Sequence, residues 1–169
     1  MQHETDTDVL VIGLESSGTR WVEDILRLTI GRGKVHHFSL PRFSQKDGIR
    51  YVHSVHHFAP HQHTSVVLVV RDLTIAKLSS EKHFDQGEDR EKTIADAIFQ
   101  MRAYLGDARF NTHVWSYETS MLLQDAYVHP LVAEITGVVF PSWLYDIQYS
   151  DGNPKYFGVD NNNTETTTT

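Results

Sequence analysis

The chain has no cysteine among its 169 residues, so it has no disulfide, no thiol nucleophile and no cysteine metal ligand. Long apolar runs are missing too: the first, Val9–Gly13, is far shorter than the roughly 20 residues that cross a bilayer. The N-terminus is polar and acidic, unlike a secretion signal. We therefore expect a cytosolic protein without a membrane span.

An excess of positive charge is also missing, since 15 Lys and Arg face 22 Asp and Glu for a net charge of −7. Nonspecific nucleic-acid binders usually have a basic surface, so we expect no nucleic-acid partner. The 40% hydrophobic content is that of one globular domain, which we place at residues 9–157. Residues 1–8 are expected to be a flexible N-terminus, and the Asn- and Thr-rich residues 158–169 a disordered tail.

Short apolar runs alternate with stretches of helical periodicity along the domain. This alternation predicts an α/β fold of three layers, a central parallel sheet flanked by helices. The expected strands are Val9–Gly13, Lys34–Leu40, Ile49–Val55, Val66–Val70 and Thr112–Tyr117. The expected helices are Thr19–Ile30, Leu73–Phe84, Glu91–Leu105 and Leu131–Thr136, the last with Pro130 at its start.

Two groups of apolar side chains are predicted to fill the core. One is a stripe at helical spacing: Ile94, Ala97, Ile98, Met101 and Leu105. The other is a set of aromatic residues: Trp21, Trp115, Trp143 and Tyr145.

The first strand leads into a loop with the spacing Gly13-x4-Gly18, and a helix follows. Such a loop directs backbone N–H groups and the positive end of the helix dipole at one point, which suits a phosphate or sulfate. The lysine of a P-loop is missing, because Thr19-Arg20 follows Gly18. The motif thus indicates a phosphorylated ligand but not an ordinary ATPase or GTPase.

A second motif follows the strand Val66–Val70, which ends in Arg71. Ligands of parallel sheets bind at the carboxyl ends of the strands, so Arg71 is expected near the loop. Ser79 lies two turns along the next helix, and a guanidinium and a hydroxyl so placed suit one phosphate. In the alternative, Arg71 forms a salt bridge with Asp72 or with a neighbouring residue, and Ser79 is plain helix surface.

These motifs resemble the sulfotransferase superfamily that uses 3′-phosphoadenosine 5′-phosphosulfate (PAPS). In that family a strand leads into a 5′-phosphosulfate loop ending in Gly-Thr, as in Ser17–Trp21. A second strand ends in arginine, with a serine after seven further residues, as for Arg71 and Ser79. Tyr117-Glu118 is similar to the start of a Tyr-Glu-Asp-Leu motif, and Asn153–Tyr156 to an Asn-x-Lys-Tyr segment.

The resemblance covers residues 9–157 and implies a P-loop-like fold that transfers a sulfuryl group from PAPS to a hydroxyl acceptor, a small molecule or a saccharide. The bound nucleotide would be PAPS or its product, adenosine 3′,5′-bisphosphate. The candidate cofactor-binding residues are Ser16, Ser17, Gly18, Thr19, Arg20, Arg71, Ser79 and Lys155.

The loop departs from the family at one position. Ser16 stands where the family usually has a lysine, and Glu15 adds a negative charge beside it. Arg20, Lys77 and Lys155 are candidates for the missing positive charge. Two alternatives stay open: a nucleotide or phosphate-ester kinase, which the missing P-loop lysine disfavours, and a relic that binds the nucleotide without transfer.

Seven of the 11 histidines lie between residues 36 and 63. A sulfotransferase needs a base for the acceptor hydroxyl, and histidine suits this near neutral pH. The resemblance places the base between the two cofactor motifs, where His53 is the first candidate and His56 the second, while some members of the family use a carboxylate instead. His61 and His63 have the spacing of two metal ligands, but no acidic or cysteine partner has a recognisable spacing, so no metal is predicted. Candidates for lining an acceptor pocket are Phe38, Phe43 and Phe58.

Overall fold

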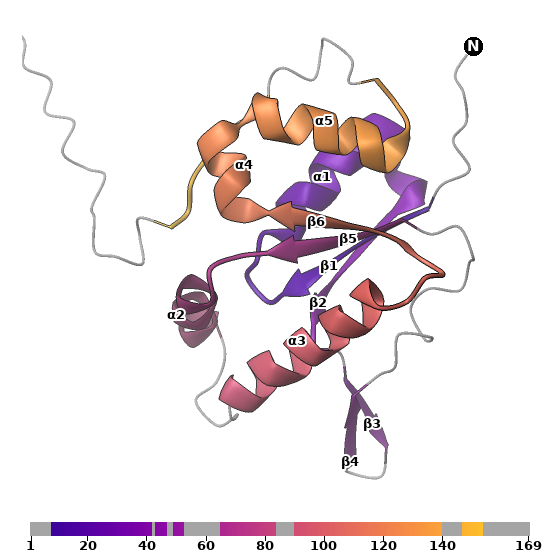
Figure 1. The fold of residues 1–169 in the computed structure, drawn as a ribbon. Helices are drawn as coiled ribbons and strands as arrows, with labels where there is room; N and C mark the ends of the chain where they lie inside the picture. The colour runs from indigo at the N-terminus through magenta and orange to yellow at the C-terminus, as the bar shows by residue number, and fades with distance from the viewer. Residues whose placement is uncertain are drawn as a thin grey trace, which may run out of the picture.

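The computed structural model describes residues 8–41, 43–46, 49–52, 65–83, 90–139 and 147–153. Its main sheet has four parallel strands in the order β2-β1-β5-β6, which confirms the predicted α/β fold with helices flanking a parallel sheet (Figure 1). The strands of this sheet are β1 (Val9–Leu14), β2 (Val35–Leu40), β5 (Ser65–Val70) and β6 (Asn111–Ser116). The helices are α1 (Thr19–Ile30), the 3-10 turn η1 (Arg32–Lys34), α2 (Leu73–His83), α3 (Arg90–Leu105), α4 (Tyr117–Leu123) and α5 (Asp125–Thr136).

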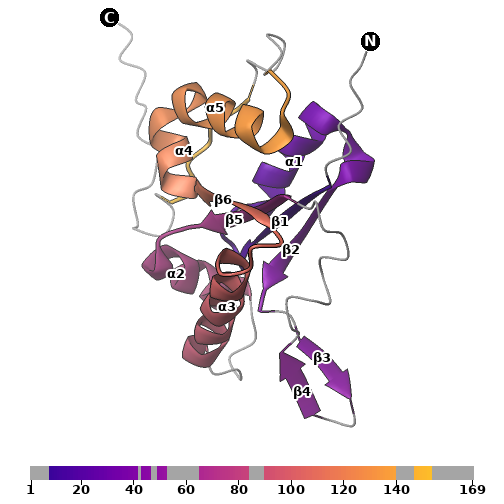
Figure 2. The ribbon, with the colours of Figure 1, turned by 45° about the vertical axis from the view of Figure 1, so that its right-hand side comes forward.

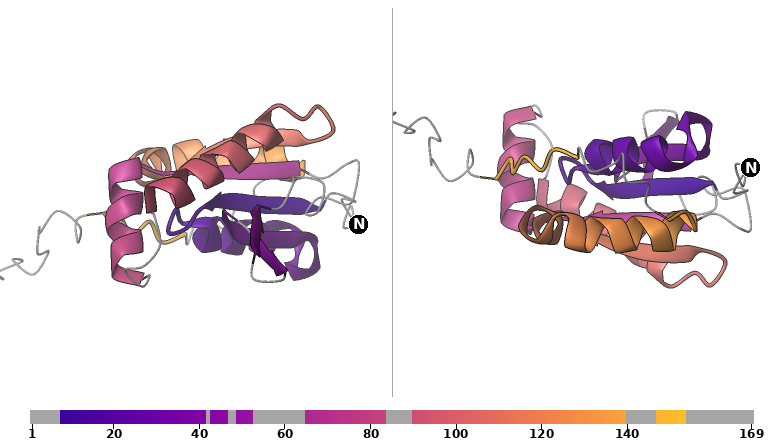
Figure 3. Two further views of the ribbon diagram at one scale, coloured as in Figure 1. Left: turned by 90° about the horizontal axis from the view of Figure 1, so that it is seen from below. Right: turned by 90° about the horizontal axis from the view of Figure 1, so that it is seen from above.

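The sheet lies between two layers of helix, α1 and α5 on one face and α3 on the other (Figure 3). Side chains alternate between these faces along each strand. On β1, Val9 and Val11 pack against α1 and α5, while Leu10 and Ile12 join the core beneath α3. Because β1 is covered on both faces, every one of its residues is buried, and the loop that follows it starts from a rigid support.

The strand predicted at Ile49–Val55 is not part of this sheet. Its described part, β4 (Ile49–Val52), pairs antiparallel with β3 (Phe43–Lys46) in a separate two-stranded ribbon (Figure 2). A parallel neighbour requires a long crossover, whereas an antiparallel partner needs only a tight turn. The pair Asp47-Gly48, typical of such turns, separates the two strands in the sequence.

The prediction of a helix starting at Pro130 was also wrong. Helix α5 starts at Asp125 and contains Pro130, and α4 precedes it without having been predicted. Proline removes a single hydrogen bond within a helix, here the one to the carbonyl of Ala126, so the other contacts of α5 can offset its cost. Tyr117, expected as the last strand residue, is the first residue of α4.

The predicted core is confirmed in part. Trp115 is fully buried, as are Ala97 and most of Met101, but Leu105 is 55% exposed, so the predicted helix stripe was wrong at its end. Tyr104 takes that place in the core because it lies seven residues, or two turns, after Ala97, and burial raises the pKa of its hydroxyl to about 12. Trp143 and Tyr145 lie outside the described residues. Within the described ranges, the helices are too short or too polar to span a bilayer.

Candidate functional site

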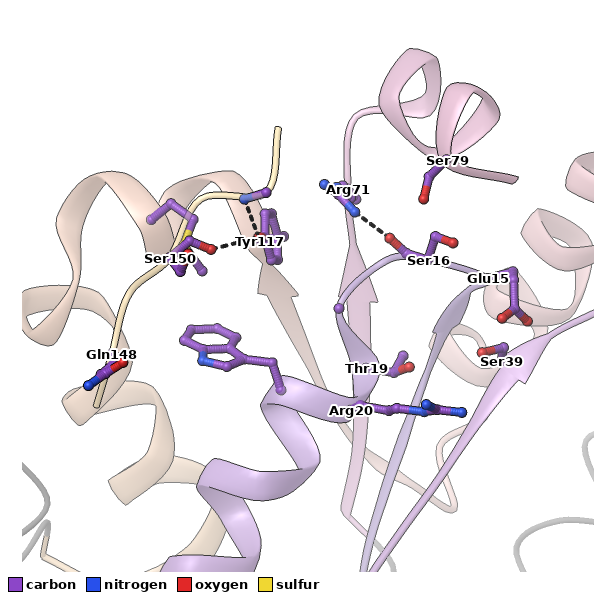
Figure 4. Close-up of a pocket in the computed structure, with 14 residues that line it drawn as sticks. Glu15, Ser16, Thr19, Arg20, Ser39, Arg71, Ser79, Tyr117, Gln148 and Ser150 are labelled. Atoms are coloured by element: carbon purple, nitrogen blue, oxygen red, sulfur yellow. Dashed lines mark hydrogen bonds between the residues drawn. The ribbon is translucent and has the colours of Figure 1, made fainter. Parts of the chain in front are cut away.

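A cavity of about 500 Å³ opens at the carboxyl edge of the main sheet, where β1 and β5 end (Figure 4). Its floor is the loop between β1 and α1, which was predicted to bind an anion. The remaining walls come from segments far apart in the sequence: Ser39 of β2, Arg71 after β5, Ser79 of α2, Tyr117 of α4, and the segment 147–153. The edge of the sheet therefore collects the motifs that the sequence separates.

Two glycines make the loop possible. A Cβ on Gly13 would lie 2.6 Å from the carbonyl oxygen of Val69, so only glycine permits this approach of β1 to β5. Gly18 has φ +90°, and a Cβ there would lie 2.7 Å from the ring of Tyr117. Ser16 also has a positive φ, 64°, which is uncommon for a residue with a side chain. The loop is therefore held in one conformation by both its backbone and its surroundings.

The first turn of α1 is open at the floor of the cavity. No side chain caps this helix at Gly18, and its first turn contains no acidic residue. The first N–H groups of a helix have no partner within the helix, and they carry the positive end of its dipole. The geometry therefore suits an anion at Thr19 and Arg20, both of which line the cavity.

Arg71 links the two predicted phosphate-binding motifs. Its Nη1 donates a hydrogen bond to the carbonyl oxygen of Ser16 in the loop (Figure 4). Its Nε, at 3.2 Å, and its Nη2 donate to Oδ1 of Asn153, and its guanidinium lies 4.5 Å from the ring centroid of Tyr117. The predicted juxtaposition of Arg71 with the loop thus holds in the structure.

The carboxylate of Asp72 serves the start of α2 instead of a salt bridge with Arg71. It accepts hydrogen bonds from the N–H groups of Thr74, at 2.8 Å, and Ile75, at 3.1 Å. The N–H of Asp72 donates to Glu118, at 3.0 Å. Ser79 is not plain helix surface, because it is 2% exposed and lines the cavity beside Arg71.

The segment 147–153 forms a wall of the cavity that sequence reasoning missed, apart from its last residue. The hydroxyl of Tyr117 donates to the carbonyl of Ser150, at 3.4 Å, and accepts from the N–H of Gly152, at 3.2 Å. The hydroxyl of Tyr149 donates to Asp125 of α5, at 2.8 Å. Burial and then this hydrogen bond raise the pKa of Tyr149. Ile147 and Tyr149 alternate with Gln148 and Ser150 and pack against the core, but so short an alternation does not indicate where along the sheet edge the segment lies.

Trp21 lies at the boundary between the core and the cavity. Its ring makes edge-to-face contacts with Trp115, Tyr117 and Tyr149, with centroids 5.9–6.3 Å apart. It packs against the core, as predicted, but it also lines the cavity. The prediction missed this second role because helical spacing shows which face of α1 Trp21 occupies and not how far its ring extends along the sheet edge.

The cavity collects most of the described residues that were predicted to bind the cofactor. Ser17 differs: its side chain is fully buried beneath the loop, and its hydroxyl has no hydrogen-bond partner among the described residues. The predicted residues that do line the cavity are Ser16, Gly18, Thr19, Arg20, Arg71 and Ser79.

Other predicted residues lie elsewhere. His53, His56, His61, His63, Phe58 and Lys155 are outside the described residues, and the side chain of Phe43 is too. Lys77 pairs with Glu91, at 3.7 Å, and does not line the cavity. Phe38 packs against the core beneath α3 instead of an acceptor pocket, since β2 turns it to that face. Among the residues that the structure describes, no cluster of three or more histidine and acidic side chains is placed to hold a metal ion.

Comparison with known proteins gives this chain no relative: no family model, no curated protein and no solved structure matches it.

Proposed function

We propose that this protein binds PAPS and transfers its sulfuryl group to a hydroxyl acceptor, a small molecule or a saccharide. The observation that supports this most is the hydrogen bond from Arg71 to the carbonyl of Ser16, which brings both phosphate-binding motifs into one cavity. PAPS requires two such sites because it carries a 3′-phosphate and a 5′-phosphosulfate on the same nucleoside. A cytosolic location is part of this proposal.

In this proposal the 5′-phosphosulfate lies on the open N–H groups at the start of α1. The 3′-phosphate lies between Arg71 and Ser79, where the guanidinium supplies positive charge and the hydroxyl of Ser79 supplies a hydrogen bond. The adenine lies against the aromatic wall formed by Trp21 and Tyr117, whose rings are 6.3 Å apart.

Transfer requires positive charge near the bridging oxygen, which becomes the leaving oxygen when its bond to sulfur breaks. Ser16 supplies none where the resembled family has a lysine. Arg20 follows the same loop in the first turn of α1 and lines the cavity, whereas Lys77 lies outside the cavity. We therefore assign the stabilising charge to Arg20.

Calorimetry with adenosine 3′,5′-bisphosphate tests the donor site. Arg71→Ala is expected to weaken binding by about 100-fold, because it removes charge-assisted hydrogen bonds from a partly buried phosphate site. Lys77→Ala is the matched control, since it removes a cation from α2 outside the cavity, and its affinity should stay within about twofold. Unmeasurable binding to the unmodified chain would refute the proposal.

The serine at position 16, where the resembled family has a lysine, favours one alternative: a relic that binds the nucleotide and has lost the transfer of the sulfuryl group. Turnover of PAPS by the unmodified chain would exclude it. A thermal-shift measurement distinguishes a kinase from a sulfonucleotide-binding protein. If Mg-ATP raises the melting temperature more than the bisphosphate does, a kinase is favoured, and if the bisphosphate raises it more, the sulfonucleotide site is favoured.

A further inference from the structure

The cavity has two chemically different sides, one on each flank of the loop (Figure 4). Tyr117, Gln148 and Ser150 lie toward α4 and the segment 147–153. Glu15, Arg20 and Ser39 lie on the other flank, toward β2. Because the aromatic rings that suit the adenine are on the first side, the second side is left for the acceptor.

Glu15 is fixed at this acceptor side by its place in the fold. It follows β1 directly, and its backbone N–H donates to the carbonyl of Leu40 at the end of β2, at 3.4 Å. Its side chain is exposed and makes no hydrogen bond or ion pair with another residue in the described part of the chain. A carboxylate would thus stand open beside the loop that binds the phosphosulfate.

The chemistry of the lining residues singles out Glu15. A general base must lie within hydrogen-bond reach of the hydroxyl that it deprotonates, and it must be able to accept a proton near neutral pH. Among the described lining residues, Arg20 and Arg71 are cations, the hydroxyl of Tyr117 already donates to Ser150, and serine and threonine hydroxyls are not bases at this pH. Glu15 is the one carboxylate in this described set, and the set contains no histidine.

We propose that Glu15 is the general base of the transfer reaction, a role that depends on the sulfotransferase function proposed above. The acceptor oxygen attacks sulfur, the bond between sulfur and the bridging oxygen breaks, and its electron pair goes to the 5′-phosphate of the bisphosphate. The acceptor proton goes to the Glu15 carboxylate. The products are the sulfate ester, adenosine 3′,5′-bisphosphate and a protonated Glu15, which returns the proton to water.

The same side also indicates the class of acceptor. Glu15, Arg20 and Ser39 offer hydrogen-bond acceptors and donors, and none of these three side chains is aromatic. Such a wall suits a polyhydroxylated acceptor such as a saccharide better than a phenol, because several hydroxyls can be hydrogen-bonded at once.

The test measures release of bisphosphate from PAPS with p-nitrophenyl β-glucoside, with p-nitrophenol, and with water alone. Glu15→Gln keeps the shape of the side chain and removes the base, so kcat with the glucoside should fall by about 100-fold or more. Bisphosphate affinity should stay within about threefold or tighten slightly, because a negative charge near the anion is removed. Asp24→Asn is the matched control: Asp24 is exposed on α1 and does not line the cavity, so kcat should not change.

His53→Ala and His56→Ala serve as the competing variants. A loss of kcat in either of them, with Glu15→Gln unaffected, would overturn the role of Glu15. Faster transfer to p-nitrophenol than to the glucoside would overturn the acceptor class. If the unmodified chain binds the bisphosphate but transfers the sulfuryl group of PAPS neither to the glucoside, nor to p-nitrophenol, nor to water, the role of Glu15 as a base is refuted and the donor site stands. If the bisphosphate does not bind, the proposed function itself fails.

Discussion

Helices α1 and α2 both start at the carboxyl edge of the sheet, yet their first turns differ. Asp72 occupies the start of α2 with its own carboxylate, which accepts hydrogen bonds from Thr74 and Ile75. Helix α1 starts from Gly18, which has no side chain to do this. Both helices direct their first backbone N–H groups to the sheet edge, where an anion could bind. In a helix capped by a side chain, these N–H groups already have a hydrogen-bond partner.

The two strand ends contribute to the cavity in complementary ways. After β1 the backbone of the loop faces the cavity, while after β5 the side chain of Arg71 reaches across to the carbonyl of Ser16. One end therefore supplies N–H groups and a dipole, and the other supplies the positive charge of a guanidinium. In the proposed function, a ligand with two anionic groups would be held by both strand ends together.

The largest effect on the difference between the two helix starts is expected for Gly18→Ala. The new Cβ would meet the ring of Tyr117 at 2.7 Å in a backbone with φ +90°, so the loop must move. We expect bisphosphate affinity to fall by more than about 100-fold and the free energy of unfolding to fall by about 2 kcal/mol. Calorimetry and thermal unfolding measure the two effects.

Gly31→Ala is the control for backbone strain. Gly31 has nearly the same φ, +94°, but apart from its own chain neighbours no atom of the described residues lies within 4 Å of its added Cβ. Because its ψ of 153° lies in a region that is essentially restricted to glycine, the variant should cost about 1–3 kcal/mol of stability and leave bisphosphate affinity unchanged. Equal losses of affinity in the two variants would mean that the loop conformation has no special part in binding.

Ser16→Lys should have a smaller effect in the opposite direction. The added cation would lie beside the open start of α1, so bisphosphate affinity should rise by about tenfold at low salt and by less at 0.5 M salt. Titrations at two salt concentrations measure this. An unchanged affinity would show that Arg20 and Arg71 already neutralise the ligand.

The smallest effect on binding is expected for Asp72→Ala. Losing the cap of α2 should lower the free energy of unfolding by about 1 kcal/mol, while bisphosphate affinity should change by less than about twofold. Chemical denaturation and calorimetry provide the two values. A gain in affinity would show that an uncapped α2 also attracts the anion, and would remove the distinction between the two helix starts.

Local patterns predicted β1, α1 and β5, which meet at the cavity, well. The bounds of α1 match the prediction, and β1 and β5 each differ from it by a single residue. Buried parallel strands and amphipathic helices have strong periodic signals, so their positions follow from neighbouring residues alone. The strand at Ile49 was assigned to the wrong sheet because periodicity identifies a strand but not its partner.

The candidate site was predictable to the extent that it consists of motifs. Gly18, Arg71 and Ser79 could be named because their spacing carries a signal, whereas nothing in the sequence around Gln148 and Ser150 indicated a cavity wall. Trp21 was assigned to the core alone for a related reason: the sheet edge exposes part of a ring that helical spacing places inward.

The sequence by itself determined that α1 starts uncapped after a glycine, and that the loop has serine where a lysine would bring charge. Only the tertiary structure decided that Arg71 holds the carbonyl of Ser16 and the side chain of Asn153, and that Glu15 lies on the flank of the cavity toward β2. The reason is physical. Capping and backbone conformation depend on residues a few positions apart, whereas contacts across 55 and 82 positions exist only after the strands have taken their order in the sheet.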